Sequence, residues 1–304
     1  MNLTNWLKAF RLPFLTATII PVALGSVIAW NHGGGFNWFL FFLTTLGISF
    51  LHIGTNLAND YFDHKSGNDD INKTPTPFSG GSRVIQEGSI KAKSVFLAAL
   101  GFFALGSIVG LYINRLLDSN FILILGVVGV FFGFFYTAAP FKIGYYGFGE
   151  LVVGFCFGPL VVVGAYYVQA QTFNTSAALA SLPVGILITM VLYINEFLDY
   201  AADKASKKNT LVVVLGKKKA LSLYHSLLVF TYLVIIALLV FEVLPLICFI
   251  AFLSAPLAFK AFKISKENFN KINELIPANA LTIALHLAVG VLLIIGFILD
   301  KVIA

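Results

Sequence analysis

The sequence predicts an all-α, multi-pass membrane protein, and its composition, its apolar segments and its basic residues support that prediction. Of the 304 residues, 59% are hydrophobic and only 11% are charged, and the mean hydropathy is +0.90. A soluble domain carries about 25% charged residues. The apolar segments are therefore expected to cross a membrane rather than to fill the core of a soluble protein.

Nine apolar segments are long enough to span a bilayer. Gly and Pro occur inside several of them, which membrane helices tolerate because neighbouring groups satisfy the freed backbone. Only a short stretch around Glu242 and Pro245 separates the seventh segment from the eighth. The predicted spans are residues 12–30, 38–57, 94–113, 121–138, 150–169, 177–197, 221–241, 243–259 and 278–299. We expect them to form one domain over residues 1–304.

The basic residues predict the orientation of these helices. All Lys and Arg residues except Arg115 and Lys301 lie in the N-terminal segment or in the loops after the second, fourth, sixth and eighth apolar segments. Because cytoplasmic loops are enriched in Lys and Arg, we expect the N-terminus and these loops in the cytoplasm and the C-terminus outside. Termini on opposite sides of the cell membrane require an odd number of spans, and the nine predicted spans meet this requirement.

The composition disfavours two other classes of site. The isoelectric point near 9.2 would suit nucleic acid, but the basic residues are spread over several membrane-flanking loops and form no single patch. We therefore expect no nucleic-acid partner. Cys156 and Cys248 both lie inside apolar segments, so neither a disulfide framework nor a thiolate metal site is expected.

Two acidic segments, at the ends of the second and sixth apolar segments, carry the clearest functional signal. The first contains Asn56, Asn59, Asp60 and Asp63, and the second contains Asn195, Glu196, Asp199 and Asp203. On a helix, the side chains of each set share one face. Like charges placed this closely repel one another, so their repetition at a membrane boundary predicts binding of divalent metal.

The same arrangement indicates an internal duplication. The two acidic segments lie 139 residues apart, from Asn56 to Asn195, and each precedes a basic loop that the predicted topology places in the cytoplasm. We interpret this as a duplicated four-helix unit followed by a ninth helix. A weak repeat of this kind can also arise by chance, because one helix boundary resembles another.

Mg²⁺ is the expected metal. It prefers oxygen ligands and is usually shared with phosphate groups, so two facing carboxylate clusters predict a diphosphate substrate. The predicted ligands, which are also the predicted catalytic carboxylates, are Asp60, Asp63, Asp199 and Asp203. Asn56, Asn59 and Asn195 lie on the same helical faces and are predicted to bind substrate.

Anion-binding groups follow both acidic segments. The small-residue turn 78–83 offers backbone amides and the guanidinium of Arg83 to a phosphate group, although an ordinary turn is the alternative. Lys208 follows the second acidic segment, and Lys142 stands alone in the loop after the fourth span, close to Tyr136. We predict that Arg83, Lys208 and Tyr136 bind substrate and that Lys142 is catalytic.

Other polar residues near the helix ends are expected to have ordinary roles. Those interpreted as solvated helix ends are Asp69, Asp70, Lys204 and residues 217–219. His52 lies one turn from Asn56 on the same face. It either lines a cavity or, as we expect, is a buried histidine with a hydrogen-bond partner.

The polar motifs resemble those of the UbiA superfamily of intramembrane prenyltransferases. The resemblance extends over nearly the whole chain, because two separate motifs recur at the expected helix ends. The matching residues are 59–63 with 65–67 and Asp69; Asn195, Asp199 and Asp203 with Lys208, Thr210 and Leu211; and 136–137, Pro140, 149–150, Arg11 and Pro21. The chain is most similar to the MenA-like branch, which prenylates 1,4-dihydroxy-2-naphthoate on the way to menaquinone.

This resemblance implies nine helices around a central cavity, with the aspartates holding Mg²⁺ on a polyprenyl diphosphate. It also implies a small aromatic acceptor and a prenyl tail in a groove open to membrane lipid. Two residues depart from the branch, because Leu198 stands where Arg is usual and Lys207 stands where Gly is usual. The metal motifs are intact, so the departures concern the choice of acceptor.

Three alternatives stay open at this point. A prenyltransferase for another phenol or for a non-aromatic lipid would show the same metal motifs. A cation transporter could use the acids as an ion path, but transport sites lie near the bilayer midplane and these acids lie at helix ends. A structural membrane subunit with a vestigial metal site is disfavoured by the intact ligands of both motifs.

Overall fold

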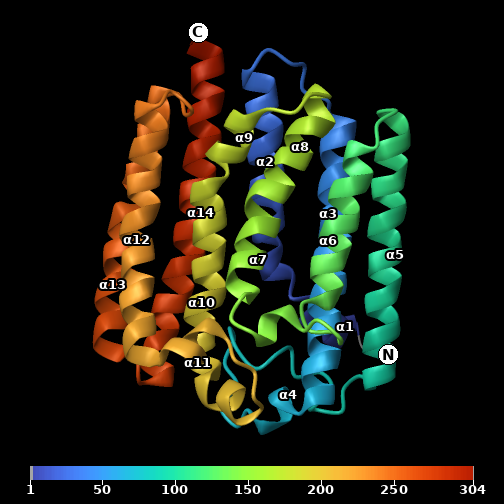
Figure 1. Ribbon diagram of the computed structural model, residues 1–304, viewed down its shortest axis with the longest axis vertical. Helices are drawn as coiled ribbons and strands as arrows, with labels where there is room; N and C mark the ends of the chain where they lie inside the picture. Colours follow the sequence, from blue (N-terminus) through green and yellow to red (C-terminus); the bar gives the residue numbers. More distant parts are fainter. Residues whose placement is uncertain (1–2, 304) are drawn as a thin grey trace.

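Long helices run side by side along one axis in the computed structural model, which describes residues 3–303 (Figure 1). Within this range the chain forms no β-strand, so the predicted all-α architecture is confirmed. In chain order the elements are α1 (Leu3–Phe10), η1 (Leu12–Leu15), α2 (Thr16–Asn31), α3 (Trp38–Ser66), α4 (Asn68–Ile71), α5 (Ala92–Leu116), α6 (Phe121–Phe135), η2 (Ile143–Tyr145), α7 (Gly149–Phe155), η3 (Cys156–Leu160), α8 (Val161–Ala170), α9 (Thr175–Ala180), α10 (Leu182–Ala205), α11 (Leu211–Leu215), α12 (Lys217–Val240), η4 (Leu246–Ser254), α13 (Ala255–Asn268) and α14 (Ile272–Ile303).

Eight helical stretches within residues 3–303 are long and apolar enough to cross a membrane. The predicted span 121–138 corresponds to α6, which has 15 residues and is shorter than these eight. The multi-pass architecture is supported, whereas the count of nine spans stays a prediction. In Figure 1, α1 lies at one end of the bundle and the last turns of α14 lie at the other, as an odd number of crossings requires.

Both acidic segments lie inside regular helix. The predicted ends of the second and sixth spans, residues 57 and 197, fall short because α3 continues to Ser66 and α10 continues to Ala205. Hydropathy marks the end of the apolar face, but the polar residues continue the helix beyond it. Gly67, with a φ of 78°, ends α3 and turns the chain into α4. The ends of α3 and α10 lie at the same end of the bundle (Figure 1).

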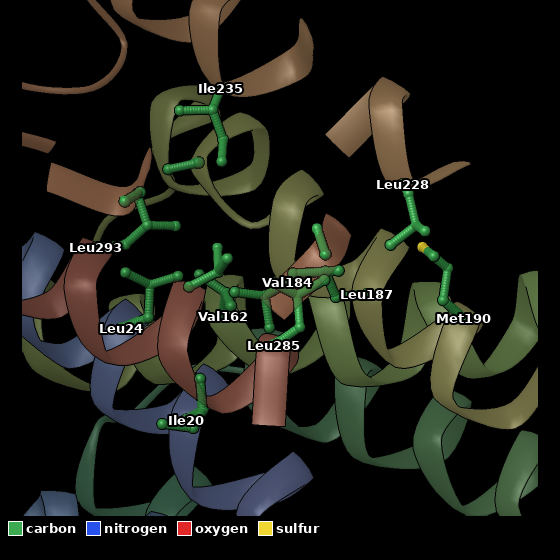
Figure 2. Close-up of a cluster of buried hydrophobic side chains, with 14 of the residues drawn as sticks. Ile20, Leu24, Val162, Val184, Leu187, Met190, Leu228, Ile235, Leu285 and Leu293 are labelled. Carbon is green, nitrogen blue, oxygen red and sulfur yellow. The ribbon is translucent and has the colours of Figure 1, made fainter. Parts of the chain in front are cut away.

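The core gathers around α10. Val184, Leu187 and Met190 of this helix are fully buried and belong to a cluster with side chains from α2, α8, α12 and α14 (Figure 2). The other residues labelled in Figure 2 are Ile20, Leu24, Val162, Leu228, Ile235, Leu285 and Leu293. Because lipid is as apolar as these side chains, close packing rather than transfer out of water holds the helices together.

Glycines let α10 approach the helix that faces it. A Cβ atom on Gly185 would lie 2.9 Å from the carbonyl oxygen of Gly154, and one on Gly158 would lie 2.7 Å from the Cα atom of Gly185. No real side chain fits at these distances, so the contact needs small residues. Pro159 has no N–H group to donate, and the helix makes a π-helical turn, η3, at this point. Leu160 of this turn lines the central cavity.

Cysteines at exposed positions in the loops and at the start of α12 can measure the orientation. We expect Lys73→Cys and Lys218→Cys to react with a membrane-impermeant maleimide only from the cytoplasmic side, and Thr172→Cys only from outside, because only the segments around positions 73 and 218 are basic. The unsubstituted protein, whose cysteines are Cys156 and Cys248, is the control and should stay unlabelled. Labelling of positions 73 and 218 from opposite sides would contradict the predicted topology.

Candidate functional site

A cavity of about 1250 Å³ extends through the bundle between α3, α5, α6, the α7–α8 region and α10. One end is polar and is lined by Asp63, Asp199, Asp203 and Lys208, among others. Farther along, the lining becomes apolar as far as Ile122 at the start of α6. The cavity therefore joins a charged site at one end of the bundle to an apolar interior.

Asp60 is held by the N-terminal segment and by the loop after α4. Arg11, which has a φ of 52° between α1 and η1, donates to the Asp60 carboxylate. The backbone N–H of Ser82 donates to Asp60 Oδ1 at 3.2 Å, and the Ser82 hydroxyl donates to Oδ2. Asp60 is only 3% exposed, so a cation and two hydrogen bonds compensate its buried charge.

Asp63, one turn farther along α3, contacts a second cation. Lys208 Nζ lies 2.8 Å from Asp63 Oδ2, and the Tyr145 hydroxyl donates to Oδ1 at 2.7 Å. Asn59 donates to Asp63 Oδ2 at 3.2 Å from the preceding turn of the helix. Asn59 and Asp63 therefore share a face of α3, as their spacing predicts.

Side chains of α4 and the loop after it connect the two acidic segments. Asn68 donates to Asp203 Oδ1 at 2.9 Å, and Asn72 donates to Asp199 Oδ1 at 2.7 Å. The backbone N–H of Gly80 donates to Asp199 Oδ2 at 3.4 Å. Carboxylates that are far apart in the sequence therefore face one site.

The small-residue turn 78–83 packs directly on the carboxylates. Gly80 and Gly81 have φ angles of 75° and 72°, and a Cβ atom on Gly81 would lie 2.6 Å from Asp69 Oδ2. Only glycine lets the backbone come this close in that conformation. Arg83 lines the cavity and donates to the backbone carbonyl of Asp69. The turn therefore forms part of the cavity wall.

Asp69 belongs to the site as well. Its interpretation as a solvated helix end is wrong, because its side chain is buried and lines the cavity, whereas Asp70 is exposed as expected. Burial, together with the carboxylates of Asp63 and Asp60, raises the pKa of the Asp69 carboxyl to about 8. The signal that could have identified it is Gly67, whose left-handed turn folds the chain back onto α3.

Lys208 is a fixed cation at the polar end of the cavity. Burial by itself lowers the pKa of its ammonium group, but the carboxylates of Asp63 and Asp203 outweigh burial and hold the pKa well above the ordinary lysine value. The backbone N–H of Asn209 donates to the carbonyl oxygen of Tyr145 at 3.1 Å, which anchors the loop that carries Lys208.

Tyr145, rather than Lys142, is the residue of the α6–α7 loop that reaches the carboxylates. Lys142 is absent from the described residues that line the cavity, and its Nζ lies 5.3 Å from the centroid of the Tyr145 ring. The Tyr145 hydroxyl hydrogen-bonds both Asp63 and the hydroxyl of Ser66. In the sequence nothing distinguishes Tyr145 from its exposed neighbour Tyr146, so only the fold of the loop identifies it.

The remaining residues predicted to bind substrate all line the cavity; they are Asn56, Asn195 and Tyr136. Asn279 of α14 orients Asn195 by donating to its Oδ1 at 2.8 Å. His52 also lines the cavity, and its Nδ1 lies 2.8 Å from the hydroxyl of Thr18. The expectation of a buried, hydrogen-bonded histidine is therefore confirmed, and the same residue faces the cavity.

Two further acids, Glu196 of α10 and Glu150 at the start of α7, are buried, and Glu196 lines the cavity. Glu150 Oε1 in turn accepts the backbone N–H of Leu211, the first residue of α11, at 2.7 Å. The hydroxyl of Thr189 in α10 donates to the backbone carbonyl of Glu150 at 3.0 Å, so Glu150 ties α7 to both α10 and α11.

The two departures from the MenA-like pattern have different structural settings. Leu198 is 3% exposed, belongs to the core cluster around α10 and is absent from the described residues that line the cavity. Lys207 has a φ of 60°, a conformation that favours glycine. The first departure therefore lies outside the cavity, and the second concerns the backbone of the loop before Lys208.

The acidic side chains fit a hard divalent cation. At the polar end, five carboxylates meet three cations, namely Asp60, Asp63, Asp69, Asp199 and Asp203 against Arg11, Arg83 and Lys208. The excess of negative charge and the oxygen donors suit Mg²⁺. No three acidic, histidine or cysteine side chains within residues 3–303 form a ready-made metal centre. Metal binding would therefore require some carboxylates to exchange their present partners for the ion.

Comparison with known proteins gives a consistent picture. The family model described as the UbiA prenyltransferase family matches residues 18–281. The chain is 30% identical to a 1,4-dihydroxy-2-naphthoate octaprenyltransferase of Bacillus subtilis over 286 residues, which are 94% of this chain and 89% of that protein. It is also 30% identical to the 1,4-dihydroxy-2-naphthoate octaprenyltransferase of Escherichia coli, over 97% of this chain and 96% of that protein.

A solved structure shares the fold. The structure of a UbiA homolog from Archaeoglobus fulgidus bound to GPP and Mg²⁺ matches with a TM-score of 0.64 and 17% identity. The match covers 95% of this chain and 99% of that chain. The helical arrangement is therefore common to both molecules from end to end.

Removal of one hydroxyl should test the role of Tyr145. We expect Tyr145→Phe to destabilise the protein by about 1.5–3 kcal/mol, because the buried hydrogen bond to the Asp63 carboxylate is lost. The measurement is the midpoint of thermal denaturation in detergent. Tyr146→Phe, which changes an exposed neighbour in the same loop, is the matched control and should stay within about 0.5 kcal/mol of the unsubstituted protein. Equal midpoints for the two variants would contradict this role.

Proposed function

Because this chain belongs to the UbiA prenyltransferase family and is a prenyltransferase, we propose that it transfers a polyprenyl group from polyprenyl diphosphate to 1,4-dihydroxy-2-naphthoate, with Mg²⁺ as its cofactor. The names of two relatives that cover most of the chain favour this acceptor over another phenol or a non-aromatic lipid. Family membership argues against the transporter and the structural subunit.

The shape and charge of the cavity carry the proposal. A polyprenyl diphosphate has a highly charged head and a long apolar tail, and the cavity has one charged end and an apolar interior. In this assignment the diphosphate lies near Lys208 and Arg83, and the tail extends along α3, α5 and α6. Lys142 lies outside the cavity wall and receives no role in the reaction.

The acids and cations at the polar end have separate roles. We assign metal binding to the aspartates Asp60, Asp63, Asp69, Asp199 and Asp203. Bound Mg²⁺ would neutralise charge on the diphosphate and make it a better leaving group. Lys208 and Arg83 offer hydrogen bonds and positive charge to the same oxygens, and an anion held by such groups is stabilised most as its charge increases.

The reaction exchanges one bond to the prenyl group for another. The bond between the allylic carbon and the diphosphate oxygen breaks, and its electron pair leaves with the diphosphate. Tyr136, which lines the cavity, offers an aromatic face to the allylic cation. A ring carbon of the acceptor then forms the new carbon–carbon bond. The bond between the ring and the acceptor's carboxylate breaks, the carboxylate leaves as carbon dioxide, and the electron pair of that bond returns to the ring and restores its aromaticity.

Both acidic segments should be required for turnover. We expect Asp60→Ala and Asp199→Ala each to lower kcat by at least about 100-fold, the effect of losing a group that stabilises developing charge. Activity should also disappear with EDTA and return with Mg²⁺. Asp118→Ala is the matched control, because the Asp118 side chain is 97% exposed in the α5–α6 loop, and it should retain full activity. Substantial turnover in Asp60→Ala or Asp199→Ala would contradict the assignment of metal binding to both acidic segments.

The acceptor can be tested with purified protein and in the host. With octaprenyl diphosphate, we expect 1,4-dihydroxy-2-naphthoate to be prenylated with release of carbon dioxide, and a simple hydroxybenzoate to give no product. Deletion of the gene should deplete menaquinone and accumulate the naphthoate. Unchanged menaquinone, with a different prenylated product missing, would keep the enzyme class and reject this acceptor.

A further inference from the structure

Glu196 lies where the polar part of the cavity wall meets the apolar part. Along the face of α10 that lines the cavity, Asp203 and Asp199 come first from the polar end, then Glu196, and then Leu192 and Val191. Glu196 precedes Asp199 by three residues and therefore lies about 4.5 Å deeper along the helix axis. A small ligand with a polar edge and an apolar body fits such a boundary.

The Glu196 carboxyl group differs from the aspartates in its hydrogen bonding. Each aspartate of the two acidic segments accepts a hydrogen bond from a described residue; these are Asp60, Asp63, Asp199 and Asp203. Glu196 is 5% exposed, and its Oε2 atom has no hydrogen-bond partner among residues 3–303. A buried acceptor without a donor is costly, so this atom is suited to a bound molecule that carries a donor.

Other unpartnered polar atoms of the cavity wall select a ligand less strongly. The hydroxyls of Thr44 and Thr210 are buried, line the cavity and have no partner among the described residues. A hydroxyl rotates and both donates and accepts, so it suits many ligand groups. Glu196 Oε2, by contrast, needs an N–H or O–H group opposite it. It therefore carries more information about the ligand than either threonine.

The proposed acceptor carries one donor that matches this need. 1,4-Dihydroxy-2-naphthoate has hydroxyls at C1 and C4 and a carboxylate at C2. The C1 hydroxyl lies beside the carboxylate and donates to it within the molecule, and the carboxylate has no hydrogen to donate. The C4 hydroxyl is far from the carboxylate and keeps its hydrogen free. A carboxyl oxygen in the wall of the pocket therefore distinguishes the C4 edge from the C2 edge.

We propose that Glu196 accepts a hydrogen bond from the C4 hydroxyl of the acceptor and thereby fixes which way round the acceptor binds. This proposal rests on the proposed function, because it takes 1,4-dihydroxy-2-naphthoate as the ligand. With C4 towards Glu196, the carbon that bears the carboxylate points towards the acidic end, where the diphosphate leaves the allylic carbon. The apolar side chains of Val191 and Leu192 lie beyond Glu196 and suit the aromatic body. Glu196 is thus a positioning residue.

Two acceptors that differ only at C4 test this role. 1-Hydroxy-2-naphthoate keeps the carboxylate and the carbon that is attacked, and C4 is meta to that carbon, so its hydroxyl affects the reactivity there little. For the unsubstituted protein we expect kcat/KM to be about 5- to 150-fold higher with the dihydroxy compound, the cost of leaving a buried acceptor without a donor. Glu196→Ala removes that acceptor and should reduce this ratio to within about threefold.

Glu150→Gln is the matched control. Glu150 is a buried acid that is absent from the described cavity lining, and glutamine keeps an oxygen for the backbone N–H of Leu211. The ratio of kcat/KM for the two acceptors should stay within about twofold of that of the unsubstituted protein. Glu196→Gln keeps a carbonyl oxygen at the position, so its ratio should lie between those of the unsubstituted protein and Glu196→Ala. It serves if the alanine variant does not fold.

The outcomes separate this proposal from the proposed function. An unchanged ratio in Glu196→Ala, or a ratio that falls as far in Glu150→Gln, would overturn the role of Glu196. Failure of the unsubstituted protein to prenylate either naphthoate would overturn the proposed function instead. The Mg²⁺ concentration that gives half-maximal activity should be the same in Glu196→Ala and the unsubstituted protein. A large increase would make Glu196 a metal ligand and contradict the assignment.

A binding measurement tests the hydrogen bond without turnover. With Mg²⁺ and inorganic diphosphate present, calorimetric titration of the unsubstituted protein should give a lower Kd for the dihydroxy compound than for 1-hydroxy-2-naphthoate. Glu196→Ala should bind the two compounds equally. 1-Hydroxy-4-methoxy-2-naphthoate, which has an oxygen at C4 but no hydrogen to donate, should bind like the monohydroxy compound. Equal Kd values for all three compounds in the unsubstituted protein would overturn the proposal.

Discussion

Carboxylates buried at a membrane boundary need compensation for their charge, and much of this structure follows from that constraint. A buried charge without a partner is far more costly than one that is paired and hydrogen-bonded. Asp60 is compensated by Arg11, and Asp63 by Lys208. Asp203 accepts a hydrogen bond from Asn68. The acids thereby bring together the N-terminal segment, α4 and the loop after α10, which are distant in the sequence.

The convergence of these segments depends on α10, a central helix that presents one face to the apolar core and another to the cavity. Along α10, Leu198 packs in the apolar core and the adjacent Asp199 faces the cavity. Successive residues of a helix point in directions about 100° apart, so one helix presents both faces. Close contact with Gly154 and Gly158 keeps α10 in place. The position of the second acidic segment is therefore set by the packing of the helix that carries it.

The features predictable from the sequence are those that depend on local periodicity. Apolar segments of spanning length predicted the helices, and acids at helical spacing predicted two carboxylate faces that meet one cavity. Loop geometry was not predictable in this way. Asp69 reaches the site because the chain reverses at Gly67, and Tyr145 reaches it whereas Lys142 does not, because the loop directs only the tyrosine towards Asp63. Gly67 is a local signal for the position of Asp69, whereas nothing in composition or spacing distinguishes Tyr145.

Helix α1, which precedes Arg11, is less buried than the rest of the bundle, and Ala9 is its buried residue. Lys8 of α1 and Glu87 form an ion pair of 2.8 Å, and their side chains are 48% and 49% exposed. A pair this exposed stabilises by at most about 1 kcal/mol. Most of α10, by contrast, is buried in the core. Local opening of α1 therefore needs less free energy than opening of α10, so the amides of α1 exchange with water first while the bundle stays folded.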